Sequence, residues 1–256
     1  MSEFHICVTI ATGHDEQGNK VFSHVLDTGE HYRIALRANK PKAKGTVMST
    51  SKNTVWLTPD NSTLLMVDHQ TGISNGVGDQ SLPEFTNNVM ALTKVGQLFK
   101  LPTVFTTSAD DGPNGPLLPG LTDILPDAPI IRRPGEINAW ANKDFVAAVK
   151  ETGRKKLIVA GVSTEVCVAF VALAALRDGY DVYAVIDASG TWSKLVADTA
   201  VQRMIQAGIV PMTWIGVAAE LQSDWRNPTG HGLAEVMGGH SFYGNTIAGF
   251  LAAKGK

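Results

Sequence analysis

The segment "KKLIVAGVSTEVCVAFVALAALRDGYDVYAVIDA", residues 155–188, contains two apolar runs with a longer, helix-like stretch between them. "KKLIVAG" (155–161) and "DVYAVIDA" (181–188) are apolar at most positions, which is typical of strands that are buried on both faces of a sheet. "TEVCVAFVALAALRDG" (164–179) has the length and composition of a helix. The segment therefore predicts a strand–helix–strand unit of a parallel sheet.

The same alternation of strands and helices extends from this unit in both directions. Four further strands are predicted in "TLLMVD" (63–68), "PTVFTTS" (102–108), "PIIRR" (129–133) and "VPMTWIGV" (210–217). Further helices are predicted over 83–100, 142–152 and 194–208. With right-handed crossovers, these elements predict an α/β fold: a three-layer αβα sandwich around a doubly wound, six-stranded parallel sheet.

The two ends of the chain differ from this pattern. Residues 1–55 predict a small β-rich N-terminal extension, with strand-like runs at 6–12, 20–27, 31–37 and 45–51. Because such a short piece buries little apolar surface, we expect it to depend on the main domain or on another subunit. Residues 56–256 form the predicted main domain, and its last part, 224–256, is predicted as an irregular arm with a short final helix at 245–254.

Composition excludes several classes of protein. The net charge of −2 offers no basis for binding nucleic acid or an anionic membrane. The chain has two cysteines in different sequence contexts, a pattern that does not predict a disulfide framework. The scarcity of cysteines favours a reducing, cytoplasmic location. The first residues lack the pattern of a secretory signal, and no run of 18 apolar residues predicts a membrane span.

Ligands of open parallel sheets bind at the carboxyl ends of the strands, so polar residues at those ends are candidates for a site. Asp68, Arg133 and Asp187 end three predicted strands, and Cys167 lies near the start of the helix after a fourth. Asp68, Arg133 and Cys167 are expected to converge on one crevice. Asp187 is interpreted as a turn or capping residue.

Cys167 has two interpretations. In the first turn of a helix, the unpaired amides and the helix dipole would lower the pKa of a thiol, and Arg133 would add a positive charge. Asp68 could then act as a general acid and base towards a cysteine nucleophile. The alternative is that Cys167 is a small apolar core residue, since free cysteines are commonly buried. Asp68 could likewise only cap a turn, and Arg133 could lie on the surface.

Several longer motifs carry a family resemblance. In chain order they are "LLMVDHQTG", "LPTVFTTS", "GPNGPLLP", "RRPGEINAWANKDFVAAVK", "LIVAGVSTEVCVAF", "DVYAVIDASGT" and "TWIGVAAELQSDWR". From about residue 60 to 227, the chain resembles the isochorismatase-like cysteine hydrolase superfamily, and most of all its YcaC-type branch. The resemblance implies a flavodoxin-like αβα sandwich with an Asp–Lys–Cys catalytic triad.

The resemblance assigns roles to individual residues. Asp68 matches the family's aspartate, Cys167 its nucleophile, and Arg133 stands at the usual lysine position. A guanidinium stays charged, so Arg133 can hold and orient but cannot serve as a base. The resemblance also implies a cis Val162–Ser163 peptide bond, with backbone N–H groups of Ser163 and Cys167 forming an oxyanion hole.

The resemblance also bears on cofactors. Related nicotinamidases hold a metal with an aspartate and histidines after the second strand, but "TTSADDGPNG" contains no histidine, and His69 alone cannot form that site. We therefore expect no metal and no cofactor. The closest dinucleotide-like string, "GVGDQS" (76–81), lacks the last glycine of the fingerprint.

The function expected from these observations is hydrolysis of a small amide or related C–N bond through a thioester. Ile137, Asn138 and Trp140 follow Arg133 in sequence and are candidates for the pocket wall, although Trp140 could instead be a core or interface residue, and Trp192 has the same ambiguity. The alternative function is a catalytically silent member that binds or assembles. The YcaC-type branch forms rings, so the resemblance implies a homo-oligomer such as an octamer.

Overall fold

The structure is a computed structural model that describes residues 9–14, 20–25, 31–35 and 55–255. The chain divides into two compact units, 1–50 and 51–256. In the first unit, β1 (Thr9–His14), β2 (Lys20–Val25) and β3 (His31–Ala35) form an antiparallel sheet in that order. These strands overlap the first three predicted runs, whereas the fourth, 45–51, lies outside the described residues.

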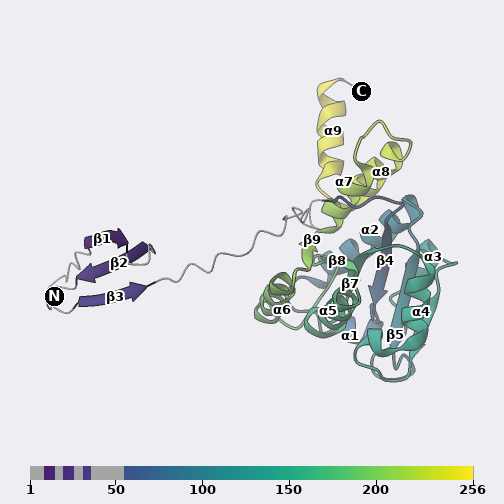
Figure 1. The fold of residues 1–256 in the computed structure, drawn as a ribbon. Coiled ribbons are helices and arrows are strands. Elements are labelled where there is room, and N and C mark those ends of the chain that lie inside the picture. The colour runs from purple at the N-terminus through teal and green to yellow at the C-terminus, as the bar shows by residue number, and fades with distance from the viewer. Residues whose placement is uncertain (1–8, 15–19, 26–30, 36–54, 256) are drawn as a thin grey trace, which may run out of the picture. The chain divides into compact units, whose positions relative to one another are not determined.

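The second unit is built on a six-stranded sheet within residues 55–255 (Figure 1). Its strands are β4 (Ser62–Val67), β5 (Thr103–Ser108), β6 (Ile130–Arg133), β7 (Lys156–Gly161), β8 (Asp181–Val185) and β9 (Val210–Met212). They pair in the order β6-β5-β4-β7-β8-β9, and every pairing is parallel. The predicted six-stranded, doubly wound sheet is confirmed.

The strand order determines where a ligand can bind. The chain winds outward from β4 to β6 on one side and from β7 to β9 on the other, so the direction reverses between β4 and β7. This is the 3-2-1-4-5-6 arrangement of doubly wound folds and differs from the flavodoxin order. Crevices of open α/β sheets form outside the carboxyl ends of strands at such a reversal.

The sheet separates two apolar layers. In β4 all six side chains are buried: Leu64 and Met66 pack into one layer, and Leu65 and Val67 pack into the other. The first layer contains side chains of α2 (Leu82–Leu98), α7 (Trp214–Gln222) and α8 (Gly230–His240), and the second those of α4 (Lys143–Glu151), α5 (Ala169–Arg177) and α6 (Lys194–Ala207). Burial on both faces explains why the central strands are apolar at successive positions.

Polar residues cap the N-termini of two main helices, α2 and α4. The side chain of Ser81 accepts a hydrogen bond from the Glu84 amide at the start of α2, and Asn142 accepts from the first-turn amides of α4. Such caps satisfy backbone donors that have no partner inside the helix. Short helical turns, α1 (Thr71–Ser74), α3 (Leu121–Ile124) and η2 (Ala139–Ala141), complete the connections near the sheet edge.

The C-terminal part differs from the sequence-based expectation in two respects. The sixth strand ends at Met212, because Thr213 caps α7 and the Asp187 carboxylate accepts the Trp214 amide at 2.9 Å. Asp187 is thus a capping residue, as interpreted. The expected irregular arm contains an additional helix, α8, whereas α9 (Tyr243–Ala253) overlaps the final helix predicted at 245–254. None of the described helices is long and apolar enough to cross a bilayer.

Candidate functional site

Asp68 lies directly after the central strand β4. Its backbone N–H donates to the Thr106 carbonyl of the neighbouring strand at 2.9 Å, and its own carbonyl accepts from Gln70 at 2.7 Å. The residue has φ of 57°, in the left-handed region that non-glycine residues seldom adopt. The carboxyl group is almost fully buried, with 1% of the residue exposed. Backbone pairing therefore carries a carboxylate into the carboxyl-end crevice of the sheet.

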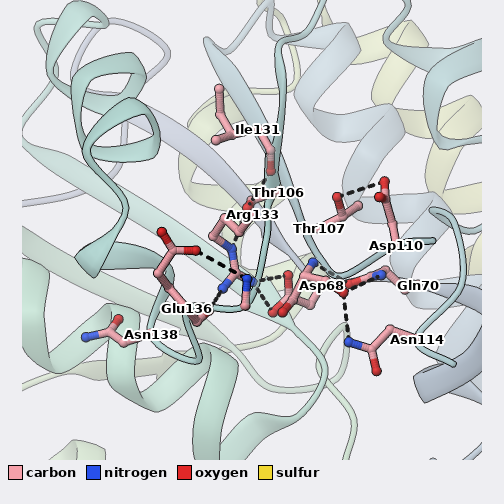
Figure 2. Close-up of polar contacts among 12 residues, drawn as sticks. Asp68, Gln70, Thr106, Thr107, Asp110, Asn114, Ile131, Arg133, Glu136 and Asn138 are labelled. Carbon is pink, nitrogen blue, oxygen red and sulfur yellow. Dashed lines mark hydrogen bonds and ion pairs between the residues drawn. The ribbon is translucent and has the colours of Figure 1, made fainter. Parts of the chain in front are cut away.

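Arg133, the last residue of β6, is buried beside Asp68 and uses every nitrogen of its guanidinium (Figure 2). Its Nη2 donates to both carboxylate oxygens of Asp68, its Nη1 to the Glu136 carbonyl, and its Nε to the Thr106 hydroxyl at 2.9 Å. A lysine could not make this set of contacts, because its ammonium lacks the planar fork. The alternative of a surface position for Arg133 is therefore ruled out, whereas the adjacent Arg132 is exposed.

Cys167 reaches the same crevice from the other side of the strand reversal. It lies in a single π-helical turn, η3 (Thr164–Val168), that leads into α5, and the Val168 amide donates to the Ser163 carbonyl at 3.1 Å. The Val162–Ser163 peptide bond before this turn is cis, as the resemblance implied. The thiol is half-buried and lies close enough to the Asp68 carboxylate for that charge to raise its pKa. The three predicted residues Asp68, Arg133 and Cys167 are brought together.

Burial dominates the electrostatics of this group. It raises the pKa of Asp68, although the Arg133 guanidinium opposes the shift. Burial also raises the pKa of the Cys167 thiol, and the Asp68 carboxylate raises it further, against smaller lowering effects of the Ser163 backbone and Arg133. The prediction of a lowered thiol pKa is therefore wrong for the resting site. The thiol holds its proton, and the nearest acceptor for that proton is Asp68.

A cavity of about 260 Å³ opens over these side chains. It is lined by Asp68, Ile73, Ser108, Asn114, Ile137, Val162, Ser163, Glu165, Val166, Cys167 and Trp192. Both the acid and the nucleophile of the predicted triad face one small space, with Ser163 beside them. The alternative interpretation of Cys167 as a residue confined to the core is not supported by this placement.

Of the three residues predicted for the pocket wall, the structure places one at the cavity. Ile137 lines it. Asn138 instead accepts the Trp140 amide at 3.0 Å and caps η2. Trp140 is buried in the second apolar layer, where its indole N–H donates to the Asp178 carboxylate at 2.8 Å. Neither Asn138 nor Trp140 lines the cavity, because η2 turns this part of the loop towards α5.

Sequence reasoning missed several wall residues, although their positions carried a signal. Ser108 ends β5 at the same sheet edge as Asp68, and Glu165 follows β7. Asn114 comes from the long loop after β5, and its amide donates to the Ser108 carbonyl at 2.8 Å (Figure 2). The rule that ligands bind at the carboxyl ends of strands would have selected Ser108 and Glu165. Asn114 depends on loop conformation and could not be placed from sequence.

Other titratable groups near the site do not assemble into a metal centre. Within the described ranges, no group of three or more His, Cys, Asp or Glu side chains could hold a metal ion. His69, next to Asp68 in sequence, is fully buried and pairs through Nε2 with the Ala188 carbonyl at 2.9 Å. Burial lowers its pKa to about 4, so the imidazole is neutral at physiological pH.

Comparison with known proteins shows which family the chain belongs to. The family model "Isochorismatase domain" matches residues 62–215. The curated protein "Probable hydrolase YcaC" of Escherichia coli K12 is 52% identical over 190 residues, which cover 74% of this chain and 91% of that protein.

Two solved structures are similar over the same part of the chain. The crystal structure of YcaC from Escherichia coli, described as an octameric hydrolase of unknown specificity, has 51% identity and a TM-score of 0.76, covering 78% of this chain and 98% of that one. YcaC from Pseudomonas aeruginosa with hexane-2,5-diol and covalent acrylamide has 51% identity and a TM-score of 0.75, covering 77% and 98%.

Proposed function

The chain belongs to the isochorismatase family of hydrolases, in its YcaC branch, and on that premise we propose that it is a cysteine hydrolase that cleaves a small amide or related C–N bond. The observation that carries the proposal is the Asp68–Arg133 ion pair beside the Cys167 thiol, on the wall of one small cavity. A nucleophile next to an oriented base is the arrangement that covalent acyl transfer needs.

In the proposed first half-reaction, the thiol proton passes to the Asp68 carboxylate as the sulfur attacks the carbonyl carbon of the amide. Burial raises the pKa of Asp68, which makes its carboxylate a better proton acceptor than an exposed aspartate. The tetrahedral oxyanion would be stabilised by backbone N–H groups of Ser163 and Cys167. Asp68 then returns the proton to the leaving amine, the C–N bond breaks, and a thioester remains on Cys167.

In the second half-reaction, Asp68 takes a proton from a water molecule that attacks the thioester. The new tetrahedral species collapses, the carboxylic acid leaves, and the proton on Asp68 returns to the Cys167 sulfur, so the site is restored. Arg133 stays charged throughout and holds both oxygens of Asp68 in place. Its role in the proposal is to position the base.

The covalent acrylamide in the Pseudomonas aeruginosa structure supports a reactive nucleophile in a close relative, because acrylamide is an electrophile that thiols attack. The octameric relative from Escherichia coli supports the further proposal that this chain is also a homo-oligomer. We place it in the cytoplasm as part of the same proposal, with a small molecule as its substrate and without nucleic acid.

The experiment is a screen of small amides and imides for release of amine or ammonia, with Cys167→Ala and Asp68→Asn as controls. We expect at least one compound to be hydrolysed by the native protein and by neither variant. The competing function is a catalytically silent protein that serves assembly or binding. No activity together with an inert Cys167 thiol would favour that alternative, whereas activity that survives in Cys167→Ala would refute Cys167 as the nucleophile.

A further inference from the structure

The wall of the catalytic cavity carries a second carboxylate, Glu165, that the proposed reaction does not use. We propose that the cavity selects small amides whose non-reacting end carries a positive charge, and that Glu165 recognises this end. The inference rests on the proposed function, because it concerns what enters the cavity that contains Cys167. It goes beyond that function by naming a substrate class and the residue that selects it.

Glu165 is held in place rather than free to move. Its Oε2 accepts a hydrogen bond from the Thr191 hydroxyl at 2.6 Å, and Thr191 is itself fully buried. The Thr191 amide in turn donates to the Asp79 carboxylate at 2.9 Å. Among the described residues, Oε1 of Glu165 takes no hydrogen bond. One carboxylate oxygen therefore fixes the side chain, while the other is available to a ligand.

The negative charge of Glu165 on the cavity wall is not neutralised by a cationic side chain among the described residues. Two of the lining residues are acidic, Asp68 and Glu165, and none of the described lining residues is Lys, Arg or His. Arg133, behind the wall, neutralises Asp68 through its ion pair. The half-buried Glu165 has no cationic partner in the described part of the chain. A cationic ligand would supply that partner, whereas an anionic ligand would place a like charge beside Glu165.

The remaining walls suit the same ligand. Trp192 lies at the cavity, half-exposed, and a Cβ on Gly76 would be 2.2 Å from its ring, so the indole rests directly on the Gly76 backbone. An indole attracts cations through its π face. Ile73 and Ile137 add apolar walls. At about 260 Å³ the cavity is smaller than the sites that hold drug-sized ligands, which restricts it to small molecules.

The experiment compares three methanethiosulfonate reagents that transfer a neutral methylthio, a cationic trimethylammonium-ethylthio or an anionic sulfonatoethylthio group to a thiol, with methanesulfinate as the leaving group. The rate of disulfide formation at Cys167 is followed by peptide mass spectrometry at low ionic strength and is divided by the rate of each reagent with a free small thiol. We expect the cationic reagent to exceed the anionic one by about tenfold or more, as for a cleft lined by one sign of charge. Added salt should reduce this ratio.

Glu165→Gln is expected to reduce the cation-to-anion ratio to near one. Glu136→Gln serves as the matched control, because Glu136 lies next to Arg133 but does not line the cavity, and it should keep the ratio. The same ratio in the native protein and Glu165→Gln, or no charge preference at all, would overturn the inference while a reactive Cys167 leaves the proposed function standing. A Cys167 that reacts with none of the reagents would refute both.

Discussion

Replacing Arg133 by methionine is the perturbation whose effect on stability follows most directly from the structure. The side chain is buried and its loss leaves the Asp68 carboxylate, 1% exposed, without its cation. Breaking a buried ion pair from one side costs about 3–5 kcal/mol of unfolding free energy. Methionine occupies a similar volume, so the effect comes from charge and hydrogen bonding rather than from a cavity. We therefore expect Arg133→Met to lose about that amount near neutral pH.

The loss should depend on pH with a defined sign. Burial raises the pKa of Asp68 in the folded protein, and removing Arg133 eliminates two of the effects that lower it. A carboxyl group with a raised folded-state pKa contributes stability below its unfolded pKa of about 3.9 and loses it as pH rises through the folded-state pKa. The deficit of Arg133→Met should therefore be largest at neutral and alkaline pH and should shrink on acidification.

The assay is urea denaturation at fixed protein concentration over a range of pH, with the m-value checked for each variant. Arg132→Met is the matched control, because Arg132 is exposed and its pair with Asp110 is expected to contribute about 0–1 kcal/mol. Asp68→Asn combined with Arg133→Met should recover part of the loss, since no buried charge remains. A loss in Arg133→Met no larger than in Arg132→Met, or a loss independent of pH, would refute the reasoning.

Three further outcomes are expected. Asp68→Asn removes a charge that raises the pKa of Cys167, so the midpoint of iodoacetamide alkylation should move to lower pH; an unchanged or higher midpoint would count against the coupling. Trp140→Ala should cost about 3–5 kcal/mol of unfolding free energy and leave the alkylation rate of Cys167 unchanged. Trp192→Ala should cost about 1 kcal/mol or less and change that alkylation rate. The reverse pattern would contradict the placement of the two side chains. Burial raises the pKa of Asp187 to about 6, so the native protein should lose stability as pH rises through that value, and Asp187→Asn should abolish this component in urea titrations.

The central sheet could be predicted from sequence because its strands are buried on both faces. Apolar runs such as 63–68 and 155–161 leave few alternatives to a covered parallel sheet. The sixth strand was extended too far, since "VPMTWIGV" is apolar through both β9 and the first turn of α7. Only the cap at Thr213 marks the boundary. The helix α8 is not predicted, because glycines and polar residues interrupt its apolar pattern, whereas α9 overlaps the final helix predicted at 245–254.

The candidate site was predictable to the extent that sheet topology determines it. Asp68 and Cys167 follow adjacent strands at the reversal of the winding direction, so their convergence follows from the strand order. Position near a helix start predicts a lowered pKa for Cys167, which is wrong because burial and the neighbouring Asp68 carboxylate, both products of the folded chain, raise it. The pocket-wall prediction for Trp140 is wrong and its alternative as a core residue is correct, because the turn of η2, which directs the side chain into the second apolar layer, cannot be derived from its neighbours in sequence.

The most direct test of the account is the mass of the protein during turnover of an amide found in the screen. Rapid acid quenching followed by peptide mass spectrometry should reveal Cys167 carrying the acyl part of that amide, and hydroxylamine should release it as expected for a thioester. Asp68→Asn should show little of this species. Hydrolysis that proceeds with Cys167 unmodified at every time point, or that persists in Cys167→Ala, would contradict a cysteine nucleophile in this site.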